Sequence, residues 1–390
     1  MGRVLTCVCG AKIASNRIAS IKCGHCGWVA DLRESSVATV HATDRTREAP
    51  EFPCIHRGPS LGVLDCGCAG SSTVYSCRLH GECMARKLKP AIGPDATCNL
   101  CDDRNSPVKY AAVITTHFNP AGHSRLRETW RQWYQHLYHD HECWELVLGE
   151  AKPEIPRSVV VRGDARNAVW QKERLINLAV EQLPAEVRYV AWVDHDLILA
   201  NPRWLETGCQ MIDDGFDAVQ LFEEVTYLDA AGMPIQTTPG AAATLAAGGL
   251  PGYAPGGAWI ASRAFLNRLG GLYDRNVVGG GDAVFFCGIT GARTSFLDRQ
   301  PPGVQADAKA WIDRVGECRW GYVRGTACHI WHGDRANRQY ISRDEILCRH
   351  DFDPQRHLRI GDNGLLELSN APQGLADEIA RYFEDRRDDG

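Results

Sequence analysis

The chain has 390 residues, of which 44% are hydrophobic and 23% charged, so it is long enough for two or three domains and too apolar to be disordered throughout. The formal net charge of -5 excludes a protein that binds polyanions over its whole surface. Residues 1–109 hold 14 Lys and Arg against 10 Asp and Glu, a net of +4, and the total of -5 leaves -9 for the remainder. The front part is therefore basic and the rest acidic.

No segment has the pattern of a signal peptide or a membrane span. The longest uncharged stretch covers 230–262, but its four prolines and seven glycines do not suit a helix in lipid. We therefore expect a long loop there, and a soluble, cytoplasmic protein without a membrane partner.

Eleven of the 17 cysteines lie before residue 102. The first four form the close pairs Cys7-x-Cys9 and Cys23-x-x-Cys26, each followed by glycine. Such a turn directs two thiolates at one cation, and two turns complete a tetrahedral zinc site. Residues 1–31 are too few to fold by apolar burial alone, so the sequence predicts a metal-held zinc ribbon there. A disulfide-linked module is the alternative, which the missing secretory signal disfavours.

A second cysteine-rich module is expected over 52–108, after a polar linker over 32–51. It holds seven cysteines and two histidines, enough for two tetrahedral sites if one histidine is the eighth ligand. We expect His80, inside a tight turn, to be that ligand, with His56 as the substitute. The histidines favour zinc over an iron–sulfur cluster, which gives about three zinc ions in the two modules. The expected cysteine ligands are Cys54, Cys66, Cys68, Cys77, Cys83, Cys98 and Cys101.

The remaining six cysteines are scattered between 143 and 348 and are expected to be buried small apolar side chains. From residue 109 on, short β-rich runs alternate with segments of helical periodicity. The expected strands cover 110–116, 143–148, 159–162, 189–193 and 218–222, and the expected helices 124–137, 169–183 and 375–387.

This alternation predicts an α/β domain with a mostly parallel sheet over 109–370, followed by a helix and charged tail over 371–390. Ligands of such sheets gather beyond the carboxyl ends of the strands. Asp194 and Asp196 stand at one such end and can form a hard-oxygen site for a divalent cation, although aspartate is also common in turns after strands. Further motifs follow: Pro255-Gly-Gly-Ala-Trp259, Gly279-Gly-Gly-Asp282 and His329-Ile-Trp-His332.

Together with a Thr-Thr-x-x-Asn segment after the first strand, these motifs resemble, over about 110–350, the nucleotide-sugar glycosyltransferases of the GT-A type. The segments 169–177 and 332–340 are similar to a bacterial and phage branch of that group, which includes transferases that modify bases of phage DNA. The sequence departs from many relatives at His195 and at Gly281, before Asp282, where a second acidic residue is common. The resemblance implies a Rossmann-like domain that moves a sugar from a nucleotide-sugar, expected to be a UDP-sugar, to a hydroxyl.

A divalent cation suits this chemistry, because the leaving nucleotide carries charge that a Lewis acid stabilises. Asp196 is the expected first ligand, and Asp194 would bind directly, through water or through the ribose. The resemblance implies a histidine near the chain end as a further ligand, His332 first and His329 in reserve. Imidazole beside carboxylates favours Mn²⁺ over Mg²⁺. A hydrogen-bonded pair of core histidines is the alternative.

Asp282 is the expected general base, which takes the proton of the acceptor hydroxyl as that hydroxyl attacks the anomeric carbon. A direct displacement of this kind inverts the configuration. The competing interpretation is a helix N-cap, because an apolar run follows Asp282. Glu223 and Glu224 are the next carboxylates to consider.

The expected donor site combines strand ends, glycines and polar positions of one helix. Lys172 or Arg174, and Arg335 or Arg338, would meet the phosphates. The expected donor-binding residues are Thr115, Thr116, Asn119, Gln171, Lys172, Arg174, Asn177, Asp194, Gly256, Gly257 and Trp259.

Three classes of function compete over the acceptor. The first is transfer to a hydroxymethylated pyrimidine in DNA, with the net-positive N-terminal region contacting phosphates. The second is transfer to a protein or surface glycan that the zinc modules grip. The third is a degenerate transferase that serves as a zinc-dependent binding module, against which the intact Asp194, Asp196 and Asp282 argue.

Overall fold

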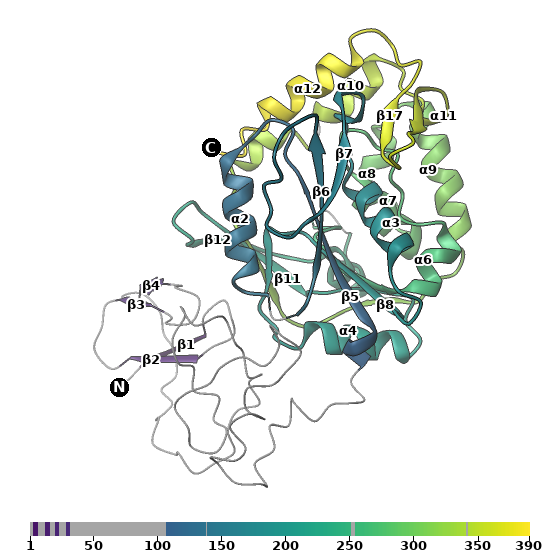
Figure 1. Cartoon of the computed structure of the whole chain (residues 1–390). Helices are drawn as coiled ribbons and strands as arrows, with labels where there is room; N and C mark the ends of the chain where they lie inside the picture. The colour runs from purple at the N-terminus through teal and green to yellow at the C-terminus, as the bar shows by residue number, and fades with distance from the viewer. Residues whose placement is uncertain are drawn as a thin grey trace.

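The computed structural model describes residues 107–137, 139–250, 254–340 and 342–390, together with four short strands nearer the N-terminus (Figure 1). These strands form two antiparallel pairs: β1 (Arg3–Thr6) with β2 (Lys12–Ser15), and β3 (Ser20–Lys22) with β4 (Val29–Asp31). The predicted zinc ligands lie outside the described residues: Cys7, Cys9, Cys23, Cys26, Cys54, Cys66, Cys68, Cys77, His80, Cys83, Cys98 and Cys101.

A seven-stranded sheet forms the centre of the main domain, in the order β14-β10-β13-β8-β5-β6-β7. All neighbouring pairs are parallel except those of β13, which runs antiparallel to both β8 and β10. The expected α/β class with a mostly parallel sheet is thus confirmed. The strands are β5 (Ala111–Phe118), β6 (Glu142–Leu148), β7 (Val159–Gly163), β8 (Tyr189–Val193), β10 (Ala218–Gln220), β13 (Ala258–Ser262) and β14 (Trp320–Tyr322).

A second sheet has four strands in the order β12-β11-β15-β9, and β16 and β17 form a separate hairpin. The strands are β9 (Leu197–Leu199), β11 (Glu224–Leu228), β12 (Pro234–Pro239), β15 (Thr326–His329), β16 (Leu358–Ile360) and β17 (Leu366–Leu368). The helices are α2 (Ser124–Tyr134), α3 (Lys172–Gln182), α4 (Trp204–Asp213), α5 (Ala241–Ala246), α6 (Arg263–Leu269), α7 (Gly281–Thr290), α8 (Ser295–Asp298), α9 (Pro302–Val315), α10 (Ser342–Arg349), α11 (Pro354–His357) and α12 (Leu375–Asp385).

The central sheet is buried on both faces, as its apolar runs predict. Strand β8 shows the alternation directly: Val190 and Trp192 pack into one core, and Tyr189, Ala191 and Val193 into the other. Helices α3, α6, α7 and α9 supply the first core, whereas α2, α4 and the second sheet supply the other (Figure 1). The strand end at Val193 is therefore held firmly between two layers, which fixes the residues that follow it.

The expected long loop over 230–262 is wrong in part, because this stretch contains β12, α5 and β13. Strand β13 is uncharged because it lies inside the central sheet, where Ala258–Ala261 are fully buried. Helix α12 and β16–β17 build a third core with α10, so the predicted terminal helix packs against the domain. No helix in the described ranges is long and apolar enough to cross a membrane. Of the six cysteines expected to be buried, Cys348 is exposed and Cys318 half-buried.

Candidate active site

A cavity of about 620 Å³ opens beyond the carboxyl ends of β5 and β8. This is where ligands of open parallel sheets collect, and both strand ends contribute to the wall. The predicted site residues that line it are Thr116, Asn119, Lys172, Asp194, Asp196, Gly256, Gly257, Asp282, His329, His332 and Arg338.

Strand pairing brings these distant parts of the sequence together. In the antiparallel pair β8–β13, Val193 is opposite Ala258, so the Asp194 backbone N–H reaches the Gly257 carbonyl at 2.7 Å. In the pair β9–β15, Leu197 is opposite His329. The Asp196 carbonyl accepts a hydrogen bond from the Ile330 backbone N–H at 2.7 Å. These contacts bring His329 and His332 close to Asp196, although the residues are far apart in the sequence.

Asp196, His329 and His332 form the one group of potential metal ligands found among the described residues, with ligand atoms within 4.8 Å of one another. The Oδ2 atom of Asp196 lies 2.7 Å from His332 Nε2 and 3.5 Å from His329 Nε2. Burial alone would raise the pKa of Asp196, but His329 and His332 hold it well below its ordinary value. One carboxylate and two imidazoles are a ligand set suited to Mn²⁺ or a similar cation. Both predicted histidines thus reach Asp196, whereas Asp194 stands apart.

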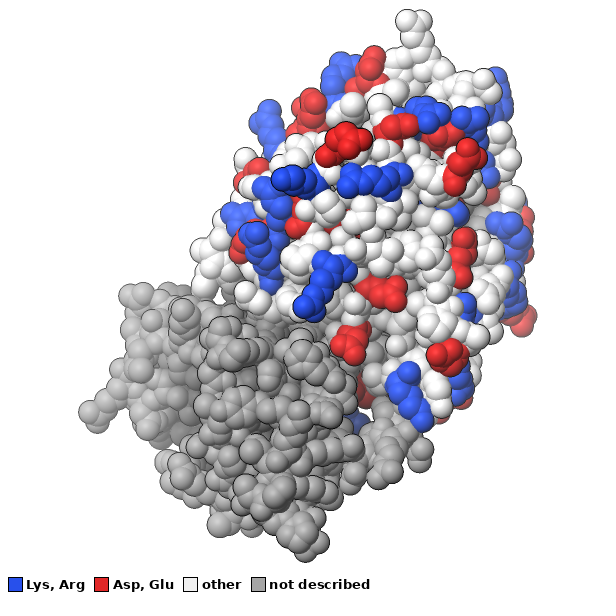
Figure 2. Space-filling view, in the orientation of Figure 1, with Lys and Arg blue, Asp and Glu red and all other residues white. Residues whose placement is uncertain are grey.

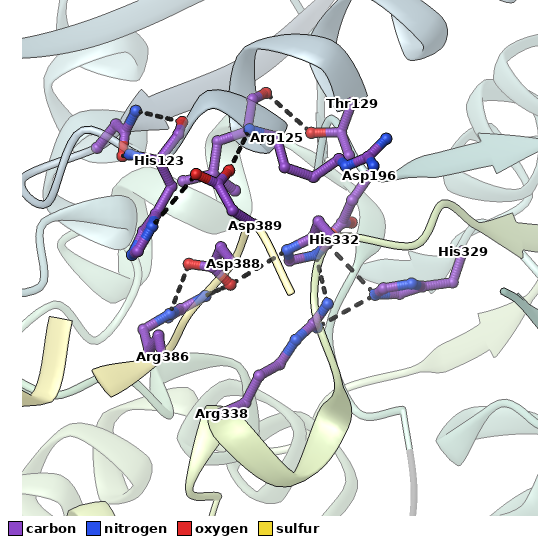
Figure 3. A network of polar contacts seen from close by, with 12 residues as sticks. His123, Arg125, Thr129, Asp196, His329, His332, Arg338, Arg386, Asp388 and Asp389 are labelled. Carbon is purple, nitrogen blue, oxygen red and sulfur yellow. Dashed lines mark hydrogen bonds and ion pairs between the residues drawn. The ribbon is translucent and has the colours of Figure 1, made fainter. Parts of the chain in front are cut away.

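Arg338 lies against the same two imidazoles (Figure 3). Its Nη2 atom is 2.5 Å from His332 Nε2, and its Nη1 atom is 3.3 Å from His329 Nε2. A guanidinium can only donate hydrogen bonds, so it faces the lone pairs that a metal would use. A bound cation and the present position of Arg338 therefore compete for the same nitrogen atoms.

Lys172 joins the two other carboxylates of the cavity. Its Nζ atom lies 2.8 Å from Asp194 and 2.9 Å from Asp282. Burial would lower the pKa of Lys172, but the charges of Asp194 and Asp282 outweigh burial and hold it well above the ordinary value. The site thus holds a permanent positive charge between two acidic side chains.

Asp282 lies in the first turn of α7, where the N-cap is Gly280 with a φ of 109°. The N-cap interpretation of Asp282 is therefore wrong. The carboxylate packs against Gly256, where an added Cβ would come within 2.3 Å of it. The side chain keeps 27% of its surface exposed, on the wall of the cavity. Glu223 and Glu224, the other carboxylates considered, do not line the cavity.

Gln171, Arg174 and Asn177, predicted to bind a donor, do not line the cavity. Gln171 is the N-cap residue of α3, and Arg174 and Asn177 lie on one face of the helix that turns away from Lys172. Each bonds a backbone carbonyl of a neighbouring segment: Gln171 to Leu366 at 2.7 Å, Arg174 to Gly364 at 2.6 Å and Asn177 to Leu272 at 2.9 Å. Their position indicates that they hold α3 in place.

Strand geometry explains two further differences. Thr115 and Thr116 are neighbours on β5, so their side chains point to opposite faces, and Thr116 alone lines the cavity. Trp259 is fully buried in the core, and its Nε1 donates to the Pro255 carbonyl at 2.9 Å. Through this hydrogen bond, Trp259 supports the turn at Gly256 and Gly257 from the core side.

A chain of hydrogen-bonded side chains, Glu154–His117–His195, reaches the cavity, and the sequence motifs do not predict it. His117 Nε2 lies 2.8 Å from Glu154 Oε2, and His117 Nδ1 lies 3.3 Å from His195 Nε2. Burial, with a smaller contribution from His117, lowers the pKa of His195 to about 3, so this ring is neutral. His195 stands out in the sequence as the middle residue of Asp-x-Asp, but nothing marks Glu154. Arg343, Arg386 and Asp388 also line the cavity and carry no motif.

No protein-family model and no curated protein matches the chain. Solved structures similar to it include Drosophila β1,4-galactosyltransferase 7, as a mutant in complex with manganese, UDP-Gal and xylobiose (13% identity, 66% of this chain and 94% of that one, TM-score 0.34). Glucosyl-3-phosphoglycerate synthase from Mycobacterium tuberculosis, with Mn²⁺, UDP and phosphoglyceric acid, is similar at 13% identity (63% and 78%, TM-score 0.32). S. aureus TarS 1–349 is similar at 13% identity (71% and 71%, TM-score 0.34). These TM-scores are below 0.5, so the site has to be understood from this chain's own residues.

The position of Asn177 leads to a first prediction. Asn177→Ala should lower the free energy of unfolding by about 1–3 kcal/mol, because the Leu272 backbone and Asp274 lose their partner in a buried place. It should leave ligand binding in the cavity unchanged. Denaturant unfolding measures the first effect and calorimetric titration with UDP the second. Lys172→Gln, on the cavity wall, is the contrasting variant and should weaken UDP binding; weakened binding in Asn177→Ala at full stability would contradict this assignment.

Proposed function

We propose that the protein is a metal-dependent glycosyltransferase that moves a sugar from a nucleotide-sugar, expected to be a UDP-sugar, to a hydroxyl acceptor. The observation that carries this proposal is the division of one cavity into two halves. One half holds a group of cation ligands, Asp196 with His329 and His332. The other half holds Asp282 beside Lys172, a carboxylate next to a fixed positive charge.

Two arginines support an anionic ligand such as a diphosphate. Arg338 and Arg343 line the cavity, and neither forms an ion pair with a carboxylate among the described residues. Each also has a buried Nε–H without a partner in this part of the chain. Buried donors of this kind lose free energy unless a ligand or water satisfies them. Arginine donors match phosphate oxygens well, and a diphosphate would use both side chains.

The donor set of the cation site fits Mn²⁺, with Mg²⁺ as the alternative. Asp196, His329 and His332 would hold the ion, and the ion would act as a Lewis acid toward the charge on the leaving diphosphate. Lys172 stands next to Asp194, the other carboxylate of the Asp-x-Asp. We assign Asp194 and Lys172 to the donor, by contact with its ribose, sugar or phosphates.

Asp282 is the proposed general base. Its Oδ2 atom lies 2.9 Å from the Lys172 ammonium on the cavity wall, where the carboxylate would take the proton of an acceptor hydroxyl. Only glycine fits at 256, because a Cβ there would come within 2.3 Å of the Asp282 carboxylate, and this close packing holds the carboxylate on the cavity wall. Asp194, the other carboxylate that contacts Lys172, is assigned to the donor, so one base remains and we propose that the reaction inverts the anomeric configuration.

For the acceptor we propose a 5-hydroxymethylated pyrimidine in DNA. The net charge of +4 over residues 1–109 supports this, because DNA affinity comes largely from phosphate contacts. On the face of the catalytic domain seen in Figure 2, basic and acidic side chains are mixed, so this face has no continuous basic surface for DNA. A protein or surface glycan is the alternative acceptor. A second alternative is a different function, that of a degenerate transferase that binds a partner without transferring sugar. Incubation with UDP-sugars, Mn²⁺ and hydroxymethylated or plain DNA, with UDP release as the measurement, separates these cases.

Cation dependence gives the next prediction. Asp196→Ala should reduce sugar transfer by about 10³-fold or more, because the charge on the leaving group loses the ion that stabilises it. UDP release under saturating donor and Mn²⁺ measures the loss. Excess EDTA should abolish transfer by the parent, and Mn²⁺ should restore it after brief chelation. Undiminished transfer by Asp196→Ala would rule out this site.

The proposed base leads to a third prediction. Asp282→Asn preserves shape and should leave the melting temperature and donor binding nearly unchanged, but should reduce transfer by roughly 10²–10⁴-fold. Steady-state kinetics measures the reduction, and NMR of the product measures the anomeric configuration. Transfer at the parent rate, or a product that retains the donor's configuration, would show that Asp282 is not the base of an inverting reaction.

The cysteine-rich modules give a fourth prediction. We propose that they bind about three zinc ions, one through Cys7, Cys9, Cys23 and Cys26. Elemental analysis of protein purified without chelator should find this stoichiometry, and Cys23→Ser/Cys26→Ser should lower it by one ion. Buried cysteines such as Cys209 offer a matched control, since Cys209→Ser should not change the zinc content. Protein without metal, or with these four thiols paired as disulfides, would contradict the assignment.

A further inference from the structure

The last residues of the described chain, 386–390, pass directly over the proposed cation site and are called here the C-terminal strap. They follow α12, and Figure 3 shows Asp389 beside His123 and Arg125 and Asp388 beside His332. Asp388 is only 2% exposed, and its Oδ1 atom lies 3.3 Å from Nδ1 of His332. The opposite ring nitrogen of His332 faces Asp196 at 2.7 Å. One imidazole therefore connects the strap to the cation site.

One contact within the strap fixes the Asp388 side chain, and two contacts with the rest of the domain hold the strap in this position. Arg386 Nε donates to Asp388 Oδ2 at 3.0 Å, within the strap. Asp389 Oδ1 accepts the Arg125 backbone N–H at 2.6 Å, at the beginning of α2. The backbone of residue 387 crosses Gly333, where an added Cβ would come within 2.5 Å of the Arg387 carbonyl oxygen. Gly333 has a φ of 84°, so both its conformation and this close approach require glycine next to His332.

We infer that Asp388 is a positioning residue that fixes His332 for the cation. A carboxylate only accepts hydrogen bonds, so the contact with Asp388 requires a proton on Nδ1 of His332. The lone pair that can bind a metal is then on Nε2, the nitrogen that faces Asp196. A second carboxylate of this kind fixes both the tautomer and the ring orientation of a metal-binding histidine. This inference rests on the proposed function, since it assumes that Asp196, His329 and His332 bind a cation.

The test measures Mn²⁺ binding directly, without donor or acceptor. Electron paramagnetic resonance of free Mn²⁺ during titration of the full chain gives the dissociation constant, and Asp196→Ala defines binding elsewhere. Asp388→Ala should raise the dissociation constant by about 10–100-fold. The double variant Arg386→Gln/Asp388→Ala, in which no buried guanidinium is left unpaired, should give the same increase. Asp385→Asn removes an exposed charge from the same helix end and should bind Mn²⁺ like the parent.

A second measurement separates this inference from the proposed function. In metal-free protein, ¹⁵N NMR of the imidazoles should show a protonated Nδ1 in His332, and the proton should be lost or exchange faster in both Asp388 variants. Folded Asp388 variants that bind Mn²⁺ as tightly as the parent, or an unprotonated Nδ1 in the parent, would overturn the inference. If the parent and Asp196→Ala bind Mn²⁺ equally, the proposed cation site is wrong. The NMR result alone then decides whether Asp388 fixes His332.

Discussion

The contact between Asp196 and two imidazole nitrogens is the interaction around which the site is arranged. These atoms are brought within 4.8 Å of one another, although their residues are far apart in the sequence. Facing lone pairs repel unless a proton, a donor or a cation lies between them. The pairing of β9 with β15 holds them together, and Arg338 supplies donors from the third side. The fold therefore maintains an arrangement that a divalent cation would stabilise.

The rest of the cavity follows from where the strands end. Strand β8 is buried on both faces and cannot shift, so Asp194 and Asp196 leave it in fixed directions. Asp194 turns toward Lys172 at the beginning of α3, and Asp196 turns toward the histidines. Two residues of one short motif thus serve different halves of the cavity. The antiparallel β13 completes the wall, because its register brings the glycines at 256 and 257 against the same turn.

Sequence patterns predicted the parts of the site that depend on local order. The strand before Asp194 and the helix after Gln171 follow from periodicity, and the late histidines follow from a resemblance. The pattern could not decide which face of α3 lines the cavity, because polar residues lie on several sides of this helix. Lys172 lines the cavity, whereas Asn177 binds the Leu272 carbonyl. The sequence pattern also failed over 230–262, because a segment without charged residues can be either a loop or a buried strand. Asp388 carries no local signal at all, because its role arises from tertiary contact with His332.

The net charge of the domain does not describe the charge of its cavity. Residues 110–390 carry a net charge of -9, which taken alone would disfavour an anionic ligand. The cavity nevertheless gathers cationic side chains, namely Lys172, Arg299, Arg338, Arg343 and Arg386. Lys172, Arg299 and Arg386 pair with carboxylates, so their charges are largely balanced locally. Arg338 and Arg343 keep buried donors unsatisfied, and charge at short range in a low-dielectric cavity outweighs distant surface charge. The proposed binding of a diphosphate is therefore compatible with an acidic domain, because the charge inside the cavity differs from the net charge of the domain.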